Sequence, residues 1–535
     1  MFNRLKGSNP SILLNCSIII LVLIGVFRLF FLALHQDMTS NDVLLYINLL
    51  DFKESGISFL TGWTSVPNLL FTDFPYYLFT DLFTSVTFPY IAYISAVIAL
   101  FSLFYIFILT QQAIRWQSAL IVLMVILGCT VPAIQWLVKP SVNTGTFNNT
   151  LLSLLFIIGL VSQSTLTQKY WIKVLMSIGL FFLIVLSMLS NLFYFYLLVI
   201  PALVSLIYVF TRLKIGASQK TLLLSLILGA AVSGWLCIIY SKPWFGFNIA
   251  YHPVILPSLS QAQFNLRTLL NVLDDFFLIK FWTIPIMGIV LFRFFSLVVC
   301  VFALLHGFRS IFVEKRTIPL LIKTYLLVMA IILSITFVLD SSIKGHENGY
   351  YLVPLLFVYA FWISLSLESV TNKLCHSILL IWIFMWVILG LSQTFVQPLP
   401  VQHHPGISNL LQSKNLQKGY SSYWHTHVIT GITNNQVKVR PVQYDKEHQL
   451  FRPFMENTPI HWFSTPYDQE STFLIVPYIS PYTEKDEYGL LFLEDTPITA
   501  NFGVPCTTYH YANPLNSEVY VIYVWPYNIG SKLRI

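Results

Sequence analysis

Residues 11–34 read SILLNCSIIILVLIGVFRLFFLAL, an apolar run in which Arg28 is the only charged residue. A membrane-spanning helix needs about 20 predominantly apolar residues, whereas the core of a signal peptide has about 7–15. We therefore predict that 11–34 is an uncleaved first span, preceded by a short N-terminus that carries Arg4 and Lys6. Arg28 lies near the far end of the run, so we expect its side chain to snorkel to the membrane interface.

Similar apolar stretches of about 17–25 residues recur along the chain. They lie near 91–111, 118–136, 149–166, 173–190, 193–211, 221–240, 283–306, 319–339, 351–368 and 376–395. The composition of the 535 residues agrees, because 56% are apolar and only 10% are charged, with a mean hydropathy of +0.72. Soluble domains carry about 25% charged residues, so a soluble enzyme is excluded. We predict an all-α polytopic membrane domain with about eleven transmembrane helices.

The basic residues indicate the orientation of these spans. With a cytoplasmic N-terminus, alternating sides place ten of them inside: Arg115, Lys169, Lys173, Arg212, Lys214, Lys220, Arg309, Lys315, Arg316 and Lys373. This positive-inside distribution explains the net charge of +7 better than a nucleic-acid partner does. The outer side then holds the loops 35–90, 241–282 and 340–350 and everything after the last span.

A second domain is expected to begin near residue 396. The segments QPLP at 397–400 and HHP at 403–405 form a stiff, polar junction, and the remainder has ordinary charge density. β-Branched and aromatic residues concentrate in 436–442, 472–478 and 519–525, with turn residues between them. We predict a membrane domain over 1–395, including the outer loop 35–90, and a small α/β or mostly β extracytoplasmic domain over 396–535.

The first outer loop is rich in acids. Only twelve acidic residues lie in 1–395, and six of them fall in this loop: Asp37, Asp42, Asp51, Glu54, Asp73 and Asp81. Carboxylates beside lipid are costly unless they are paired or used, so the cluster indicates a site at the outer membrane surface. The alternative is that a solvated outer loop carries acidic residues without any functional role. Asp42, in SND at 40–42, also has a second interpretation as the polar cap of an interfacial helix over 43–52.

Several segments together resemble the GT-C glycosyltransferases, which are integral-membrane enzymes that use polyprenyl-phosphate sugars. These are the first span with its acidic outer loop, the stretch 191–203 with Pro201, and GYYLVP at 349–354. GYSSYW at 419–424, 437–442 and 520–527 are similar to the outer domains of bacterial members. The resemblance implies that Asp42 matches the first-loop carboxylate of the family, with Asp73 as a second candidate and Asp37 as a rival.

Transfer from a polyprenyl phosphate needs a base for the acceptor hydroxyl and cations for the departing phosphate. Among the few outer cations, Arg267 is preferred because a guanidinium pairs with phosphate in a bidentate manner, and its loop also holds His252. Its alternative role is that of an interfacial anchor. Before the GYYLVP stretch, where the family often has a basic residue, this chain has ENG at 347–349, so Lys344 or His346 would take that place.

A metal cofactor is not indicated, although a divalent ion is compatible with this chemistry. The six cysteines show neither a disulfide framework nor zinc spacing. His403, His404, His425 and His427 lack Cys or acidic partners at metal-ligand spacing, so we expect them at a polar surface. Phosphate-cradling glycine loops and an H-E-x-x-H helix are absent from the sequence, which disfavours cytosolic nucleotide hydrolysis and zinc proteolysis.

The leading hypothesis is an inverting glycosyltransferase of the bacterial inner membrane with a periplasmic C-terminal domain. It would move a sugar from an undecaprenyl-phosphate carrier to an O-antigen or other surface polysaccharide, a lipid or a protein. Two alternatives stay open: a transporter or flippase of lipid-linked sugars, and a non-catalytic polysaccharide-assembly subunit. Transporters usually show repeats and midplane polar residues, whereas here the polarity concentrates in outer loops. This difference favours surface chemistry.

Overall fold

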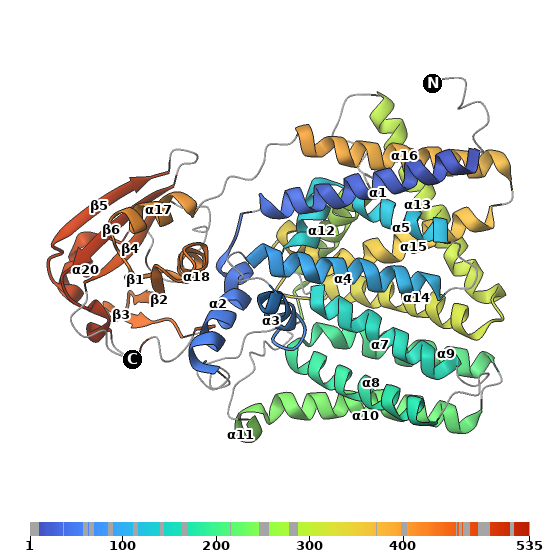
Figure 1. The fold of residues 1–535 in the computed structure, drawn as a ribbon, viewed down its shortest axis with the longest axis horizontal. Coiled ribbons are helices and arrows are strands. Elements are labelled where there is room, and N and C mark those ends of the chain that lie inside the picture. The colour runs from blue at the N-terminus through green and yellow to red at the C-terminus, as the bar shows by residue number, and fades with distance from the viewer. Residues whose placement is uncertain are drawn as a thin grey trace. The chain divides into compact units, whose positions relative to one another are not determined.

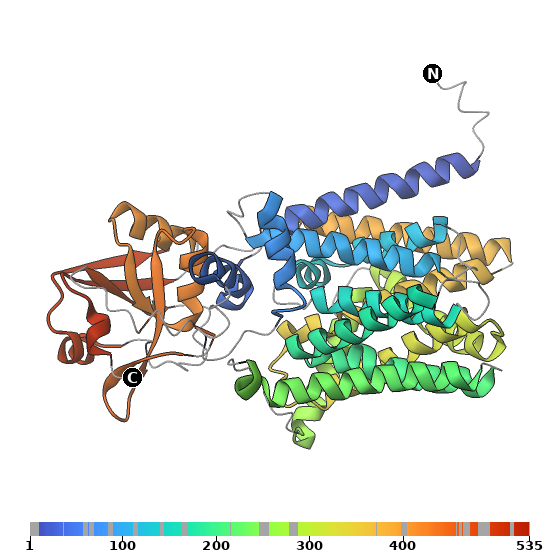
Figure 2. The same cartoon turned by 60° about the horizontal axis from the view of Figure 1, so that its bottom comes forward.

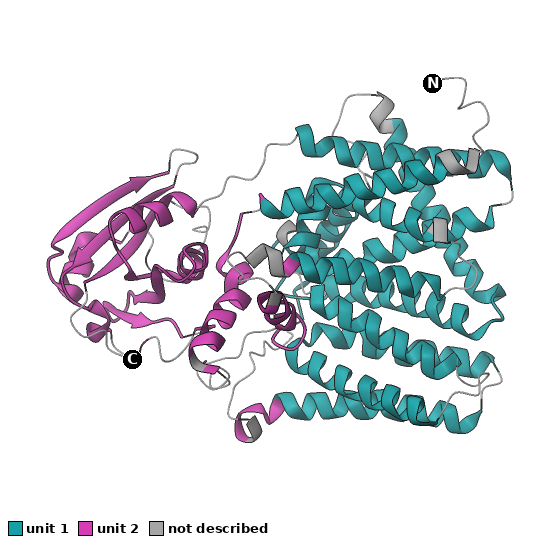
Figure 3. Ribbon diagram, in the orientation of Figure 1, with its two compact units in different colours: residues 1–34, 94–238, 251–398 teal, residues 35–93, 239–250, 399–535 magenta. Residues whose placement is uncertain are grey.

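Long apolar runs and a polar C-terminal quarter produce two compact units (Figure 3). Unit 1 comprises 1–34, 94–238 and 251–398, and unit 2 comprises 35–93, 239–250 and 399–535. The computed structural model describes residues 10–35, 37–56, 63, 69–83, 89–110, 116–139, 144–162, 170–213, 216–245, 256–277, 287–370, 372–396, 404–455, 457–458, 463, 471–479, 490, 493–513 and 518–533. The first loop therefore clusters with the C-terminal region.

Unit 1 is built from apolar helices that lie side by side (Figures 1 and 2). They are α1 (Pro10–Leu34), α4 (Pro89–Leu109), α5 (Trp116–Leu127), α6 (Val131–Val138), α7 (Thr144–Ser162), α8 (Tyr170–Ser190), η4 (Phe195–Val199), α9 (Ile200–Arg212), α10 (Ala217–Ile239), α12 (Leu259–Phe277), α13 (Met287–Val313), α14 (Thr317–Val338), η5 (His346–Leu352), α15 (Val353–Ser369) and α16 (Lys373–Val396). Their exposed faces are mostly apolar, as expected of helices that contact lipid, whereas α12 is amphipathic and exposes Arg267.

Nine helices of the described residues are long and apolar enough to span a membrane, compared with the predicted eleven. Each of the eleven stretches does coincide with helix, so the difference lies at two places. The described apolar part of α4, Tyr93–Leu109, is short, and the third predicted stretch, 118–136, is bent by 102° between Ala119–Leu127 and Val131–Val138. Counting the bent pair as one span raises the number to ten among the described residues.

The bend between α5 and α6 leaves backbone carbonyls without helical partners. Arg28 of α1 donates from Nη1 to the carbonyl oxygens of Leu127 (3.1 Å) and Cys129 (2.7 Å) and from Nε to Thr394 Oγ1 (2.6 Å). Only 4% of Arg28 is exposed. The expectation that it snorkels to the interface was therefore wrong: the guanidinium instead satisfies the carbonyls that the bend exposes.

A second irregularity precedes Pro201. The chain forms one π-helical turn, η4, before α9, and Pro201 has no N–H to donate to the carbonyl of Leu197, four residues earlier. The hydroxyl of Tyr325 on α14 donates to that carbonyl instead. This bond joins α14 to the start of α9.

In unit 2, the first loop forms α2 (Ser40–Ser55) and α3 (Phe74–Phe83), and α2 packs on α18 (Tyr423–Ile432). Ser40 Oγ donates to the carbonyl of Tyr423, and Tyr46 Oη donates to Asn434 Oδ1, both at 2.5 Å. A Cβ on Gly431 would lie only 2.2 Å from Val43 Cγ1, so the two helices approach too closely for any larger residue there. Segments about 390 positions apart in sequence thus share one apolar core.

The C-terminal part of unit 2 is a mixed sheet with helices, as the α/β alternative predicted. Its order is β3-β2-β1-β4-β6-β5, with β1 parallel to β2 and β4 and the other pairs antiparallel. The strands are β1 (Lys418–Ser421), β2 (Lys438–Asp445), β3 (Leu450–Pro453), β4 (Thr472–Ile479), β5 (Thr507–Ala512) and β6 (Val519–Trp525). α18 provides the crossover that a parallel β1–β2 pair requires. The other elements of unit 2 are α11 (Ser241–Phe245), α17 (Pro405–Ser413), α20 (Asp495–Phe502) and η6 (Ile529–Lys532).

Candidate functional site

Asp42 lies in the first turn of α2 and forms part of a capping box with Thr39. The helix starts after Thr39, whose backbone N (2.9 Å) and hydroxyl (2.7 Å) both donate to Asp42 Oδ2. The side chain is 1% exposed. A carboxylate in the first turn also interacts favourably with the helix dipole. The capping interpretation therefore has a structural basis, although the cap residue is Thr39 and Asp42 stands three positions later.

Asp73 lies in the same unit, directly before α3. Its Oδ2 accepts the hydroxyl of Thr72 at 2.8 Å, and it is 1% exposed. One helical turn later, Tyr77 is completely buried, and its hydroxyl has no hydrogen-bond partner in the described part of the chain. Burial raises the pKa of Tyr77, and the charges of Asp73 and Asp42 raise this pKa further. The negative charges of both predicted carboxylates therefore oppose ionisation of the Tyr77 hydroxyl.

Tyr77 was not singled out in the sequence analysis. It belongs to the FTDFPYY stretch at 71–77, where its aromatic ring reads as an ordinary apolar residue. Tyr77 follows Asp73 by four residues, and residues four positions apart lie on the same face at the start of a helix such as α3. That spacing was the available signal, but the approach of Asp42 comes from the packing of α2 near α3.

The other acids of the first loop hold this region together. Asp51 Oδ2 accepts the indole N–H of Trp63 at 2.8 Å, and both residues are buried. Asp81 pairs with Lys53 at 2.6 Å, and Glu54 pairs with Lys438 at 3.0 Å. Most of the acidic cluster therefore has a structural use, which narrows the chemical candidates to Asp42 and Asp73, with the half-buried Asp37 as their rival.

The predicted phosphate ligands lie in unit 1. Arg267 is exposed on α12, next to Leu266 and near Leu270, which are 47% and 59% exposed. Asn265, on another face of α12, donates to the carbonyls of Val338 and Asp340 and so holds the segment that leads to Lys344.

Two positions separate Asn265 from Arg267, which corresponds to about 200° around a helix. Arg267 therefore points away from that segment. Lys344 is itself exposed. His252 lies outside the described residues, as does the side chain of His346.

His404, His425 and His427 are buried, so the expectation of a polar surface was wrong for these three, and His403 lies outside the described residues. His404 Nε2 and His425 Nδ1 are 3.1 Å apart, and His427 Nε2 donates to the carbonyl of Asn457 at 2.9 Å. Burial lowers the pKa of His427 to about 4, with the Asn457 bond opposing the shift. Within the described residues, there is no group of three His, Cys, Asp or Glu that would hold a metal ion.

Comparison with known proteins identifies the fold. No protein-family model matches the sequence, and no curated protein matches it significantly. The crystal structure of ArnT from Cupriavidus metallidurans in the apo state is similar, with 10% sequence identity, a TM-score of 0.56, and coverage of 97% of this chain and 99% of that chain. ArnT is a GT-C glycosyltransferase. The chain has the GT-C fold.

A second solved structure with a GT-C fold is also similar. It is the Archaeoglobus fulgidus oligosaccharyltransferase in complex with Zn and sulfate, with 12% identity, coverage of 94% of this chain and 72% of that chain, and a TM-score of 0.43. A score at this level adds nothing to the fold assignment. The predicted GT-C resemblance and fold class are confirmed by the ArnT comparison.

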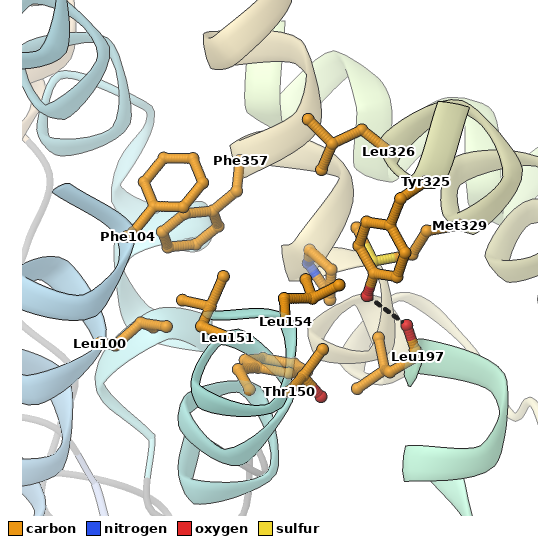
Figure 4. A pocket seen from close by; sticks show the side chains of 12 residues that line it. Leu100, Phe104, Thr150, Leu151, Leu154, Leu197, Tyr325, Leu326, Met329 and Phe357 are labelled. Atoms are coloured by element: carbon orange, nitrogen blue, oxygen red, sulfur yellow. Dashed lines mark hydrogen bonds between the residues drawn. The ribbon is translucent and has the colours of Figure 1, made fainter. Parts of the chain in front are cut away.

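The membrane unit of this GT-C fold contains an apolar pocket between α4, α7, η4, α14 and α15 (Figure 4). Phe104, Leu151 and Phe357 contribute to its wall, and Phe104 and Phe357 meet edge to face with their ring centroids 4.8 Å apart. Tyr325 also lines it, but its hydroxyl is turned to the carbonyl of Leu197. The pocket therefore offers a ligand hydrocarbon contacts.

Proposed function

We propose that this chain is an inverting glycosyltransferase that moves a sugar from a polyprenyl-phosphate carrier to a hydroxyl-bearing acceptor. The acceptor would be an O-antigen or another surface polysaccharide, a lipid or a protein, at the periplasmic face of a bacterial inner membrane. The observation that carries the proposal is the pair of buried carboxylates, Asp42 and Asp73, in one unit of a chain with the GT-C fold.

The chemistry assigns one task to a carboxylate. It accepts the proton of the acceptor hydroxyl while that oxygen bonds to the anomeric carbon and the bond from this carbon to the phosphate oxygen breaks. Polyprenyl phosphate leaves with the electron pair of that bond. We assign the base to Asp42, with Asp73 as the second candidate.

The leaving phosphate requires cations, because negative charge develops on it. We propose Arg267 and Lys344 as the contacts and His346 and His252 as further candidates. The exposure of Arg267 and Lys344 supports access to a membrane lipid.

The base assignment is tested by comparing Asp42→Asn, Asp73→Asn and Thr39→Ala in membranes supplied with a polyprenyl-phosphate sugar. Release of polyprenyl phosphate is measured by mass spectrometry. We expect Asp42→Asn to lower the rate by about 10²–10⁴, because the amide keeps the size of the side chain but accepts no proton. Thr39→Ala removes one hydrogen bond of the capping box and should cost about 1 kcal/mol of stability while leaving the rate within a few-fold of the parent.

The Thr39→Ala variant is the matched control for a purely structural role of Asp42. If Asp42→Asn and Thr39→Ala have equally small effects on the rate, Asp42 is only a helix-capping residue. A large loss in Asp73→Asn alone would transfer the role of base to Asp73. Near-normal release of polyprenyl phosphate in both aspartate variants would refute chemistry at this pair.

A further inference from the structure

A second cavity in unit 1 lies between α12, α13 and α15 and has a volume of about 270 Å³. Its wall is mostly apolar, with Phe277 of α12 and Val301 of α13 among the lining residues. Tyr359 and Phe277 pack with their ring centroids 5.0 Å apart. Val301 is 44% exposed and Leu270, another lining residue, is 59% exposed. Because both belong to the exposed apolar surface of unit 1, the cavity opens toward the lipid phase.

Three polar side chains line this otherwise apolar cavity: Asn271, Asp274 and Tyr359. Asp274 is 7% exposed. Asn271 and Tyr359 are half-buried, and neither side chain makes a hydrogen bond within the described part of the chain. A mostly apolar cavity with a few polar groups is the usual form of a ligand site.

The polar groups select the chemistry of the ligand. Among the described lining residues none is cationic, and Asp274 repels a phosphate placed beside it. An ammonium group only donates hydrogen bonds, so it would leave the donors of Asn271 and Tyr359 unused. Sugar hydroxyls both donate and accept, and they match an amide, a carboxylate and a phenol together.

We infer that this cavity binds a neutral glycolipid, with sugar hydroxyls at Asn271, Asp274 and Tyr359 and a hydrocarbon chain along α13. This inference goes beyond the proposed function, because binding here requires no sugar transfer and no polyprenyl phosphate. The site differs from the apolar pocket near Phe104, whose described lining presents no free polar group to a headgroup.

Photolabelling tests the site in the full chain. The protein is placed in phosphatidylcholine nanodiscs with a glucosyl diacylglycerol that carries a diazirine in one acyl chain, and labelled peptides are identified by mass spectrometry. We expect labelling of the α13 segment around Val301. Unlabelled glucosyl diacylglycerol should compete, whereas diacylglycerol, phosphatidic acid and phosphatidylethanolamine should not.

Variants connect the label to the cavity. Asn271→Leu and Tyr359→Phe should each reduce labelling about threefold to tenfold, the effect of one lost hydrogen bond. Val301→Trp should block the opening and abolish labelling. Tyr170→Phe makes the same chemical change on a tyrosine that is 82% exposed and does not line the cavity, so it should label like the parent.

Each competing result contradicts the inference in a recognisable way. Competition by phosphatidylethanolamine would indicate an ammonium site, and competition by diacylglycerol would indicate a site for acyl chains alone. Unchanged labelling in both Asn271→Leu and Tyr359→Phe would show that these polar side chains do not bind the headgroup. Asp274→Asn should allow phosphatidic acid to compete if the carboxylate excludes phosphate, and continued exclusion would refute that role.

Discussion

At the scale of single residues, the chain buries polar groups whose surroundings the sequence does not reveal. His427 is such a residue: it is completely buried on α18, and its Nε2 donates to the carbonyl of Asn457. Its local sequence, THV at 426–428, gives no sign of burial. Arg28 is comparable, because its partners are carbonyls about 100 positions away.

The buried imidazole of His427 should make the stability of unit 2 depend on pH. Burial lowers its pKa from an ordinary value of about 6.5 to about 4, so between these pH values only the unfolded chain binds the proton. The free energy of unfolding should therefore fall by about 3 kcal/mol as the pH decreases from 6.5 to 4. Pulse proteolysis of the full chain, followed through a C-terminal tag, measures this change.

The matched variant is His427→Gln, which retains an N–H donor for Asn457 but does not titrate. Its stability at pH 7 should be lower than that of the parent, while its additional loss on acidification should be smaller by about 3 kcal/mol. Parallel pH profiles for the two proteins would show that His427 does not control the acid sensitivity.

At the scale of elements, the bend between α5 and α6 depends on a close approach by α16. A Cβ on Gly390 of α16 would lie 1.8 Å from the carbonyl oxygen of Gly128, at the end of α5. Contacts of this kind between small residues let membrane helices approach closely. Close packing against Gly128 therefore requires a glycine at position 390, which the apolar sequence around it does not reveal.

We expect Gly390→Ala to destabilise unit 1 by about 1–3 kcal/mol or more, because the added methyl group meets backbone that has no flexible end to move. Gly229→Ala on α10 is the matched control, since a Cβ there has no atom within 4 Å. The control should be neutral or stabilising by up to about 1 kcal/mol, the helix propensity difference. Thermal aggregation of the detergent-solubilised variants, read by size-exclusion chromatography, compares them. Equal midpoints would contradict the packing argument.

At the scale of the whole molecule, the first loop and the C-terminal region form one unit although the membrane helices separate them in sequence. Val43 of α2 and Gly431 of α18 mark the contact, with 3.6 Å between Val43 Cβ and a Cβ built on Gly431. This distance falls within the range of about 3.5–4.5 Å found in disulfides. An ion pair between Glu54 of α2 and Lys438 of β2 also joins the first loop to the C-terminal region.

The double variant Val43→Cys and Gly431→Cys should therefore form a disulfide in a background without the six native cysteines. A protease site inserted between α9 and α10 lets a non-reducing gel show whether the two halves remain joined. Val43→Cys with Gly503→Cys is the control, because Gly503 lies beside Tyr527 instead. If the first pair separates as readily as the control pair, α2 does not pack on α18.

The sequence by itself determined the parts of this protein that depend on local composition. The apolar runs predict helices because a bilayer excludes unpaired backbone groups, and 472–478 and 519–525 predict strands through their β-branched and aromatic residues. The sequence also singled out Asp42 and Asp73 as candidate catalytic carboxylates.

The tertiary structure alone decided which distant groups meet. Packing of α2 and α3 buries Asp42, Asp73 and Tyr77 in one unit, Arg28 reaches carbonyls exposed by a bend, and His427 is buried. The bend and the short described part of α4 together reduce eleven apolar stretches to nine long helices within the described residues. These outcomes follow from long-range packing of side chains on surfaces that form only when remote segments fold together, so no local pattern of residue types encodes them.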